Sequence, residues 1–434
     1  MRIGLIGDNS LEFVELLLKI WSDSNCAVII DWRMPACRIN ELLLEAEVEC
    51  CFIDEIYFNE DIYNESSIQY IPYKKNSDVV VKLSERIVQQ YSAEYSDKEA
   101  LILYSSGTTG KNKGIILTYA AININADAIC NYMSLSSVDS IYIAKTLSHS
   151  STIVGELLVG LKSDCSIYVS STIVPPKFAL DNINDFGITT VCVNPALLLL
   201  YTKSEKFKSH PFSKLKAIYT SGSILRENHL QLVRSSIKDV KILNVYGLTE
   251  AGPRVTAQTL TDVNIDGSVG KQIKGVEVKI VKQSDIQNSD YGVIHVKTPS
   301  AFNGYVSGVG QNVDKDGWIN TGDMGYLDEN NNLFIVGRYD NMMLIGSHNV
   351  YPESIESILN QSDLVNDCIV YSYNDPIQGE KIICNYIADK TVSNELREYC
   401  TAVLAPYEIP KEFIRVKKIE CTYNGKKSRS KYGN

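Results

Sequence analysis

Short apolar runs alternate with amphipathic stretches from the start of the chain. Apolar residues fill positions 3–6, polar turn residues follow, and from Leu11 to Trp21 apolar residues recur on helical spacing. This alternation continues to about residue 53, resumes after Ala100 and runs to about Tyr246. Strands that alternate with helices predict a parallel sheet with helices on both faces, so we expect an α/β fold. The first predicted elements are strands at 3–6, 26–30 and 49–53 and helices at 11–21 and 39–47.

The texture of the sequence then changes in three places. Residues 57–97 are polar and tyrosine-rich, and we interpret them as a surface connection with one helix near 79–91. Between residues 268 and 305, short β-rich runs separated by glycines predict a small barrel or antiparallel sheet. Beyond Arg338–Asn341 the pattern predicts a compact α+β unit with helices near 352–361 and 393–404 and strands at 367–373 and 382–388. We therefore predict a large N-terminal domain, residues 1–339, of layered β-α-β sheets with a small β-barrel-like subdomain, and a small α+β C-terminal domain, residues 340–434, on a hinge.

Composition and charge narrow the class of partner. The 434 residues are 44% hydrophobic and 22% charged, which is typical of a globular protein. The 42 Lys and Arg residues are outnumbered by 52 Asp and Glu, and the net charge of −10 argues against a general attraction to nucleic acid or to an anionic membrane. Acidic residues interrupt the first apolar stretch, so we expect no targeting segment there. Eleven cysteines without a repeated spacing read as reduced thiols, which favours the cytoplasm.

The first candidate motif is a strand that runs into a loop of glycines and hydroxyl residues with two lysines, from Leu101 to Gly114. Such a loop leaves backbone N–H groups free to converge on a phosphate, and hydroxyl and ammonium groups add further donors. It is not a Walker A loop, because Lys111 is followed by Asn112 instead of Ser or Thr. For the glycines alone, a flexible surface turn is an equal alternative.

The second motif, Asn244–Ala251, places an aromatic ring, a hydroxyl and a carboxylate directly after a predicted strand. Tyr246 offers a face for a purine, Thr249 a hydroxyl for a phosphate, and Glu250 a ligand for Mg²⁺. A carboxylate at the end of a strand is more often a solvated or helix-capping group, and that interpretation stays open on these residues alone.

Two further motifs lie nearer the C-terminus. A Thr-Gly-Asp triplet ends at Asp323 and leads to Arg338 and Asp340, although an Asp in a turn is usually only turn chemistry. The basic segment Asn424–Arg429 lies close to the end of the chain, where such a tail is usually solvated.

Together, and in this order, the four motifs resemble those of the adenylate-forming superfamily, which includes acyl-CoA synthetases, luciferases and peptide-synthetase adenylation domains. The texture is most similar to acyl- or aryl-CoA ligases. Ser105 stands where the family usually has Thr, Asn112 where it has Pro, and Ser221–Leu225 resembles a Gly-Gly-Ala-Pro-Leu turn with two differences. The chain opens directly on a core strand, so we expect a shortened first subdomain relative to these proteins.

The resemblance implies a role for each motif residue. It makes residues 1–339 an adenylation core for ATP and the acyl group, and residues 340–434 a mobile domain that turns at Asp340. Lys426 is then the catalytic lysine that bridges the carboxylate and the α-phosphate, with Thr249 on that phosphate and Glu250 on Mg²⁺. Asp323 binds the ribose and Arg338 faces the nucleotide. The remaining residues implied in ATP binding are Ser105, Ser106, Gly107, Thr108, Thr109, Gly110, Lys113, Ser221, Gly222, Ser223, Tyr246 and Gly247, and those implied in the acyl pocket are His149, Gly222 and Gly247.

The implied reaction is ATP-dependent activation of a small carboxylic acid to an acyl-adenylate with release of pyrophosphate, followed by transfer to a thiol, in the first place that of CoA. Two alternatives remain: a stand-alone enzyme that loads an acyl or amino acid onto the phosphopantetheine of a separate carrier protein, and a non-catalytic nucleotide-binding relative. Leu248, and the lack of an evident Asp to bind an α-ammonium group, favour an acyl or aryl acid over an amino acid. A lone His such as His149 is more often an ordinary packed or surface residue than a pocket wall.

Overall fold

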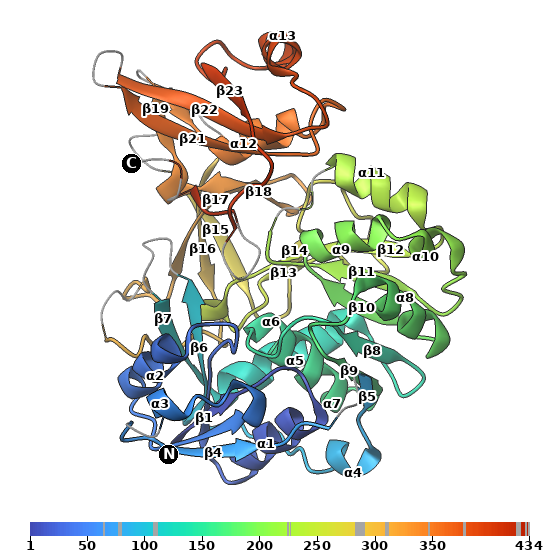
Figure 1. The fold of residues 1–434 in the computed structure, drawn as a ribbon, viewed down its shortest axis with the longest axis vertical. Helices are drawn as coiled ribbons and strands as arrows, with labels where there is room; N and C mark the ends of the chain where they lie inside the picture. Colours follow the sequence, from blue (N-terminus) through green and yellow to red (C-terminus); the bar gives the residue numbers. More distant parts are fainter. Residues whose placement is uncertain are drawn as a thin grey trace.

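Figure 1 shows the fold in a computed structural model, with the C-terminal elements stacked at one end of a larger body. The structure describes residues 1–63, 66–76, 80–106, 112–223, 225, 227–282, 291–308, 312–345, 348–375, 379–421, 427–429 and 432.

The first sheet has six strands in the order β4-β3-β1-β2-β6-β7. Its centre is parallel, and β7 returns antiparallel on β6 as one arm of a hairpin. The strands are β1 (Arg2–Ile6), β2 (Cys26–Ile29), β3 (Cys50–Asp54), β4 (Gln69–Tyr73), β6 (Glu99–Ser106) and β7 (Asn112–Thr118).

The second sheet has eight strands in the order β14-β13-β12-β11-β10-β8-β9-β5. Strands β12, β11, β10, β8 and β9 are parallel, whereas β5, β13 and β14 pair antiparallel at the two ends. The bounds are β5 (Val80–Lys82), β8 (Ser140–Ile143), β9 (Ser166–Ser170), β10 (Thr190–Val193), β11 (Ala217–Thr220), β12 (Lys241–Tyr246), β13 (Thr256–Ala257) and β14 (Lys271–Gln272).

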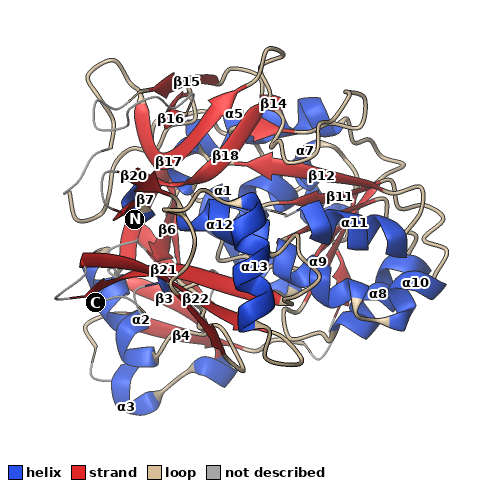
Figure 2. Cartoon of the chain, turned by 90° about the horizontal axis from the view of Figure 1, so that it is seen from above, coloured by secondary structure: helices blue, strands red, loops and turns tan. Residues whose placement is uncertain are grey.

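Helices cover both faces of both sheets. Alternate residues of a strand point to opposite faces, and both faces of these strands are apolar and need to be buried. Leu5 of β1 joins the large core between the sheets, whereas its neighbour Ile6 packs into an outer core with α2. Figure 2 shows α8, α10 and α11 gathered outside β11, and α2 and α3 on another side near β3 and β4. The helical elements are α1 (Leu11–Ser22), α2 (Ala36–Glu45), η1 (Glu55–Tyr57), α3 (Glu60–Tyr63), α4 (Glu85–Val88), α5 (Tyr119–Met133), α6 (Ser150–Thr152), the π-helical turn η2 (Ile153–Leu158), α7 (Val159–Lys162), α8 (Pro176–Asp185), α9 (Pro195–Thr202), α10 (Glu205–Ser209), α11 (Glu227–Ser236) and η3 (Thr249–Ala251).

A third, four-stranded antiparallel sheet follows, in sequence order β15 (Glu277–Val281), β16 (Gly292–Lys297), β17 (Ile319–Leu327) and β18 (Leu333–Arg338). Its last strand leads into η4 (Tyr339–Asn341). The C-terminal elements are β19 (Met343–Ile345), β20 (His348–Val350), α12 (Pro352–Leu359), β21 (Asp367–Asp375), β22 (Gly379–Ile387), α13 (Ser393–Val403) and β23 (Glu412–Arg415), which build an apolar core of their own.

The expectation for residues 57–97 was only partly right. A helix does lie within 79–91, but it is short (α4, Glu85–Val88), and the described part of the stretch also holds the unpredicted strands β4 and β5. Strand β4 extends the first sheet beside β3, and β5 pairs with β9 at the edge of the second. Because an edge strand gains its hydrogen bonds from a distant partner, its polar sequence carries no local signal for it. Among the described helices, none combines the length and apolar character needed to cross a bilayer.

Candidate active site

The turn after β12 brings the second motif into a fixed shape. Tyr246 ends the strand, and Thr249 and Glu250 open the 3-10 turn η3. Between them, a Cβ on Gly247 would lie 1.8 Å from the carbonyl oxygen of Pro253, so only glycine fits the turn. The turn is thus packed tightly enough to hold the three polar side chains in constant relation.

Tyr246, Asp323 and Arg338 form one connected group. The Tyr246 hydroxyl donates to Asp323 Oδ2 at 2.6 Å, and Arg338 Nη1 donates to Asp323 Oδ1 at 3.0 Å. The second contact follows from the register of the third sheet, in which Asp323 of β17 is paired with Arg338 of β18. Arg338 also donates to the carbonyl of Thr321 at 3.0 Å and, through Nη2, to Asp340 at 3.3 Å.

The electrostatics of this group follow from its burial and from the Asp323 charge. Burial and the neighbouring carboxylate of Asp323 both raise the pKa of Tyr246, so its hydroxyl stays a donor. Burial lowers the pKa of Arg338, but Asp323 and Asp340 together outweigh this effect and the pKa is raised overall. Asp323 is therefore held as an acceptor between a neutral phenol and a permanent cation.

Glu250 and Lys113 meet at the ring of Tyr305. The Tyr305 hydroxyl donates to Glu250 Oε1 at 3.1 Å, and Lys113 Nζ lies 5.4 Å from the centre of the same ring. Burial and the Glu250 charge raise the pKa of Tyr305, which keeps that hydroxyl protonated. Lys113 reaches this position from β7, where it pairs with Ser105 close to the end of β6 and the start of β7. Lys113 of the first motif and Glu250, the predicted magnesium ligand, thus meet at one ring.

Thr249 contacts the segment that contains His149. The hydroxyls of Thr249 and Ser150 lie 2.9 Å apart, and His149 is the residue that precedes α6. Next to this helix, η2 is a π-helical turn, a form often found at functional sites. Ser148 donates to the buried Asp31 at 3.2 Å, which fastens the segment to the loop after β2.

The predicted adenine turn lies at the end of β11. Ser221 donates its N–H to the carbonyl of Val193 at 3.1 Å, and Gly222 and Ser223 are exposed. Gly222 has a φ of +93°, and a Cβ built there meets no atom within 4 Å. The backbone at Gly222 therefore faces open space.

Several predicted residues lie outside the described part of the chain. They are Gly107, Thr108, Thr109, Gly110 and the predicted catalytic residue Lys426. Ser106 is the last residue of β6, and Asp340 lies in η4, directly after the third sheet.

The donor set fits Mg²⁺ bound together with nucleotide phosphates. In the described ranges no three His, Cys, Asp or Glu residues gather into a metal cluster. Mg²⁺ keeps few protein ligands and is usually held by one or two carboxylates plus phosphate oxygens, a role that Glu250 suits beside Lys113. An all-protein cage is not needed for this ion.

Comparison with known proteins decides the family. The model of the AMP-binding enzyme family matches residues 1–306, and that of the AMP-binding enzyme C-terminal domain matches residues 354–426. The chain belongs to the AMP-binding enzyme family. This confirms the predicted superfamily and the predicted enzyme class, an acid–thiol ligase that activates a carboxylic acid with ATP.

Similar proteins support the same class. A 2-succinylbenzoate–CoA ligase from Listeria monocytogenes is 30% identical over 77% of this chain and 69% of its own. An indoleacetate–CoA ligase from Aromatoleum aromaticum is 28% identical over 98% and 86%. The solved o-succinylbenzoate CoA synthetase from Bacillus subtilis, in complex with its acyl-adenylate intermediate, has a TM-score of 0.84 at 22% identity and covers 99% of this chain and 87% of that one. The predicted α/β fold, a large N-terminal domain with a small C-terminal one, is thereby confirmed.

Sequence analysis of this AMP-binding enzyme missed two contact residues. Ser150 lies beside His149 in the sequence but was not chosen, and Tyr305 lies in the β-rich stretch without any motif. Tyr305 pairs with Ile115 across a β-bridge, a contact between residues far apart in the chain. No local pattern signals such a partner.

Proposed function

We propose that this enzyme activates an aromatic carboxylic acid with ATP, releases pyrophosphate and transfers the acyl group to CoA. The observation that carries the proposal is Asp323, a carboxylate held between Tyr246 and Arg338 beside the turn that bears Thr249 and Glu250. An acceptor fixed in this way suits two adjacent ribose hydroxyls. The aromatic acids in the names of the similar ligases support the class of substrate.

The nucleotide would be bound along one line of residues. Tyr246 and the backbone of Ser221–Ser223 border the base, Asp323 accepts from the ribose, and Arg338 adds a positive charge beside it. The glycine loop, with Ser105 and Lys113, binds the outer phosphates, and the Thr249 hydroxyl donates to the α-phosphate. Glu250 holds Mg²⁺, which when bound screens the phosphate charge and favours departure of pyrophosphate.

The chemical difficulty is the approach of two anions. A carboxylate must attack an anionic α-phosphorus in line with the leaving group, so rate enhancement comes from positive charge and from alignment. We assign that charge to Lys426, which contacts the attacking carboxylate and the α-phosphate together. Residues 340–434 form the mobile domain that delivers it, and Asp340 is the hinge at its boundary with residues 1–339.

His149 forms part of the acyl pocket in this proposal, with Gly222 and Gly247. Its neighbour Ser150 contacts Thr249, so the pocket wall and the residue on the α-phosphate are joined by one hydrogen bond of 2.9 Å. This contact supports a pocket in which the acid lies next to the phosphorus that it attacks. The eleven free cysteines support a cytoplasmic location.

The experiment is a panel of acids assayed for ATP-dependent pyrophosphate release, with hydroxylamine to trap the adenylate. The panel holds 2-succinylbenzoate, indoleacetate, benzoate, octanoate and phenylalanine. We expect an aromatic acid to be fastest, and CoA to convert the trapped adenylate into a thioester. If the adenylate accumulates in the presence of CoA and is consumed only when a carrier protein is supplied, the acceptor is the carrier protein instead of CoA. A protein that binds ATP but releases no pyrophosphate with any acid would contradict the proposal.

A further inference from the structure

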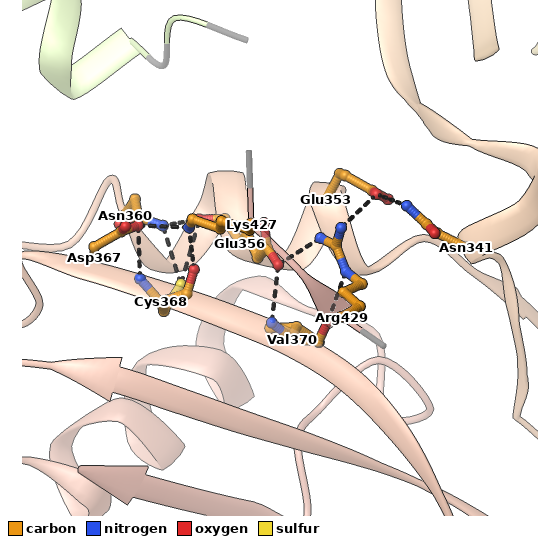
Figure 3. Close-up of polar contacts among 9 residues, drawn as sticks. All are labelled: Asn341, Glu353, Glu356, Asn360, Asp367, Cys368, Val370, Lys427 and Arg429. Atoms are coloured by element: carbon orange, nitrogen blue, oxygen red, sulfur yellow. Dashed lines mark hydrogen bonds and ion pairs between the residues drawn. The ribbon is translucent and has the colours of Figure 1, made fainter. Parts of the chain in front are cut away.

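Arg429, near the C-terminus, binds two carboxylates of helix α12. Its Nη1 lies 3.0 Å from Glu353 Oε1, and its Nη2 lies 2.6 Å from Glu356 Oε1. Its Nε donates to the carbonyl of Val370 in β21 at 3.0 Å. Figure 3 shows the guanidinium between the two carboxylates. Every edge of this guanidinium is therefore used within the C-terminal domain.

Lys427 fastens the same short segment at a second point. Its Nζ donates to Asp367 Oδ1 at 2.6 Å and to the carbonyl of Cys368, both at the start of β21. Ser428, between the two basic residues, donates its backbone N–H to Glu420 at 3.0 Å. Residues 427–429 are thus attached to α12 and β21, and Lys426 is bonded directly to the first of them.

Glu353 connects this attachment to the other side of the hinge. The Glu353 carboxylate accepts from Asn341 Nδ2 at 2.6 Å, and Asn341 ends η4. Its Oε2 lies 2.7 Å from the position that a Cβ on Gly337 would occupy. Gly337 precedes Arg338 in β18, so any larger residue there would displace the Glu353 carboxylate. The tail, the hinge and the strand that bears the nucleotide-facing arginine meet at this one side chain.

We infer that Arg429 is a positioning residue for acid activation, because it fixes the segment next to Lys426 on α12 and, through Glu353, sets that segment relative to the hinge and Arg338. The inference rests on the proposed function, in which Lys426 acts on the α-phosphate. A misplacement of about 1 Å in a catalytic group can cost about 100-fold in rate, so the anchor of the lysine has a large effect without any contact to substrate.

The charge arrangement explains why arginine is needed. Glu356 is buried, with 3% of its side chain exposed, and Glu353 is 15% exposed. Burial raises the pKa of Glu353, Arg429 opposes that rise, and the charge of Glu356 adds to it. One planar guanidinium reaches both carboxylates and a carbonyl together, whereas an ammonium at this point is too compact to do so.

The test separates the two half-reactions in Arg429→Ala and Arg429→Lys. The first is pyrophosphate release with ATP and the fastest acid of the panel. The second is thioester formation from the chemically prepared adenylate of that acid and CoA, which needs no lysine on the α-phosphate. We expect the first rate to fall about 10- to 100-fold, with KM for ATP changed less than about threefold and the second rate within about twofold. Arg415→Ala is the matched control, since Arg415 is an exposed arginine of the same domain that donates to the backbone carbonyls of Ala388 and Asp389.

Equal losses in both half-reactions, or a loss that matches the unfolded fraction, would show a merely structural arginine and overturn the inference. If Arg429→Ala does not fold, Arg429→Lys and Glu356→Gln decide by the same comparison of rates. Lys426→Ala separates the inference from the proposed function. If Lys426→Ala releases pyrophosphate slowly and Arg429→Ala releases it at the wild-type rate, only the inference about Arg429 is overturned. If Lys426→Ala releases pyrophosphate at the wild-type rate, the role of the lysine itself is overturned.

Discussion

Lys145 and Glu156 contact each other inside the N-terminal domain, where both side chains are buried. Lys145 Nζ lies 2.9 Å from Glu156 Oε1, and the two side chains are 9% and 0% exposed. Lys145 follows β8, Glu156 lies in η2, and Lys145 also donates to Ser151 at 3.3 Å. The pair therefore braces the segment that carries His149 and Ser150. Burial raises the pKa of Glu156 to about 7, although Lys145 and the buried Arg254 both lower it.

This pair predicts a pH dependence of stability. Glu156 is ionised in the unfolded chain above about pH 4.5, whereas in the fold it keeps its proton to about pH 7. Between these values the folded state binds more protons, so the free energy of unfolding falls as pH rises, by up to about 1.4 kcal/mol per unit. In Glu156→Gln we expect this fall to disappear. Urea titrations from pH 4.5 to 8 measure it, with the exposed Glu15→Gln as control. Parallel curves for wild type and Glu156→Gln would contradict the assignment.

Replacement of Lys426 tests the source of positive charge at the reacting phosphorus. We expect Lys426→Ala to lower the rate of pyrophosphate release about 10²- to 10³-fold, or about 3–4 kcal/mol, by analogy with the loss of a single oxyanion donor. The KM for ATP should change little, because the lysine contributes mainly in the transition state. Lys418→Ala is the control, since that side chain is 78% exposed. Equal rates in wild type and Lys426→Ala would remove this lysine from the mechanism.

Tyr246→Phe tests whether the phenol holds Asp323 for the ribose. The substitution keeps the ring but removes a 2.6 Å hydrogen bond to a carboxylate, a contact worth about 1.5–3 kcal/mol in general. We expect KM for ATP to rise about tenfold, with kcat changed less than about threefold. Tyr326→Phe, on the same strand as Asp323, is the control because its ring stacks on Phe334 away from this group. A kcat that falls with an unchanged KM would assign Tyr246 to the chemical step instead.

Replacement of two glycines in the site by alanine should affect different quantities: mainly the stability of the fold at Gly247 and mainly the KM for ATP at Gly222. Gly247→Ala places a methyl group against the backbone of Pro253, so we expect at least about 3 kcal/mol of destabilisation, seen as a lower urea midpoint. Gly222→Ala meets no neighbour and adds only backbone strain, about 1–2 kcal/mol. Because the methyl group of Gly222→Ala would enter the proposed base site, the main effect of this variant should be a higher KM for ATP. A stable Gly247→Ala would show that the turn can open.

Much of the site was predictable because its motifs are local. Tyr246, Thr249 and Glu250 lie within five residues at the end of one strand, and such a pattern can be read directly from the sequence. The contact between Asp323 and Arg338 was not, since it depends on the register of two strands that include a bulge at Met324 and Gly325. A shift of one residue in that register would leave the Asp323 and Arg338 side chains on opposite faces of the sheet, where they could not meet.

Outside residues 57–97, the sequence by itself determined the alternation of strands and helices and the residue types at the turns, because hydrophobic spacing, glycines and caps act over a few neighbouring positions. Only the tertiary structure decided which distant segments meet: β4 beside β3, β5 beside β9, Tyr305 beside Glu250, and Arg429 between Glu353 and Glu356. These contacts depend on how the folded chain as a whole buries its apolar faces and pairs its charges. That balance is summed over the whole molecule and leaves no trace in a short stretch of residues.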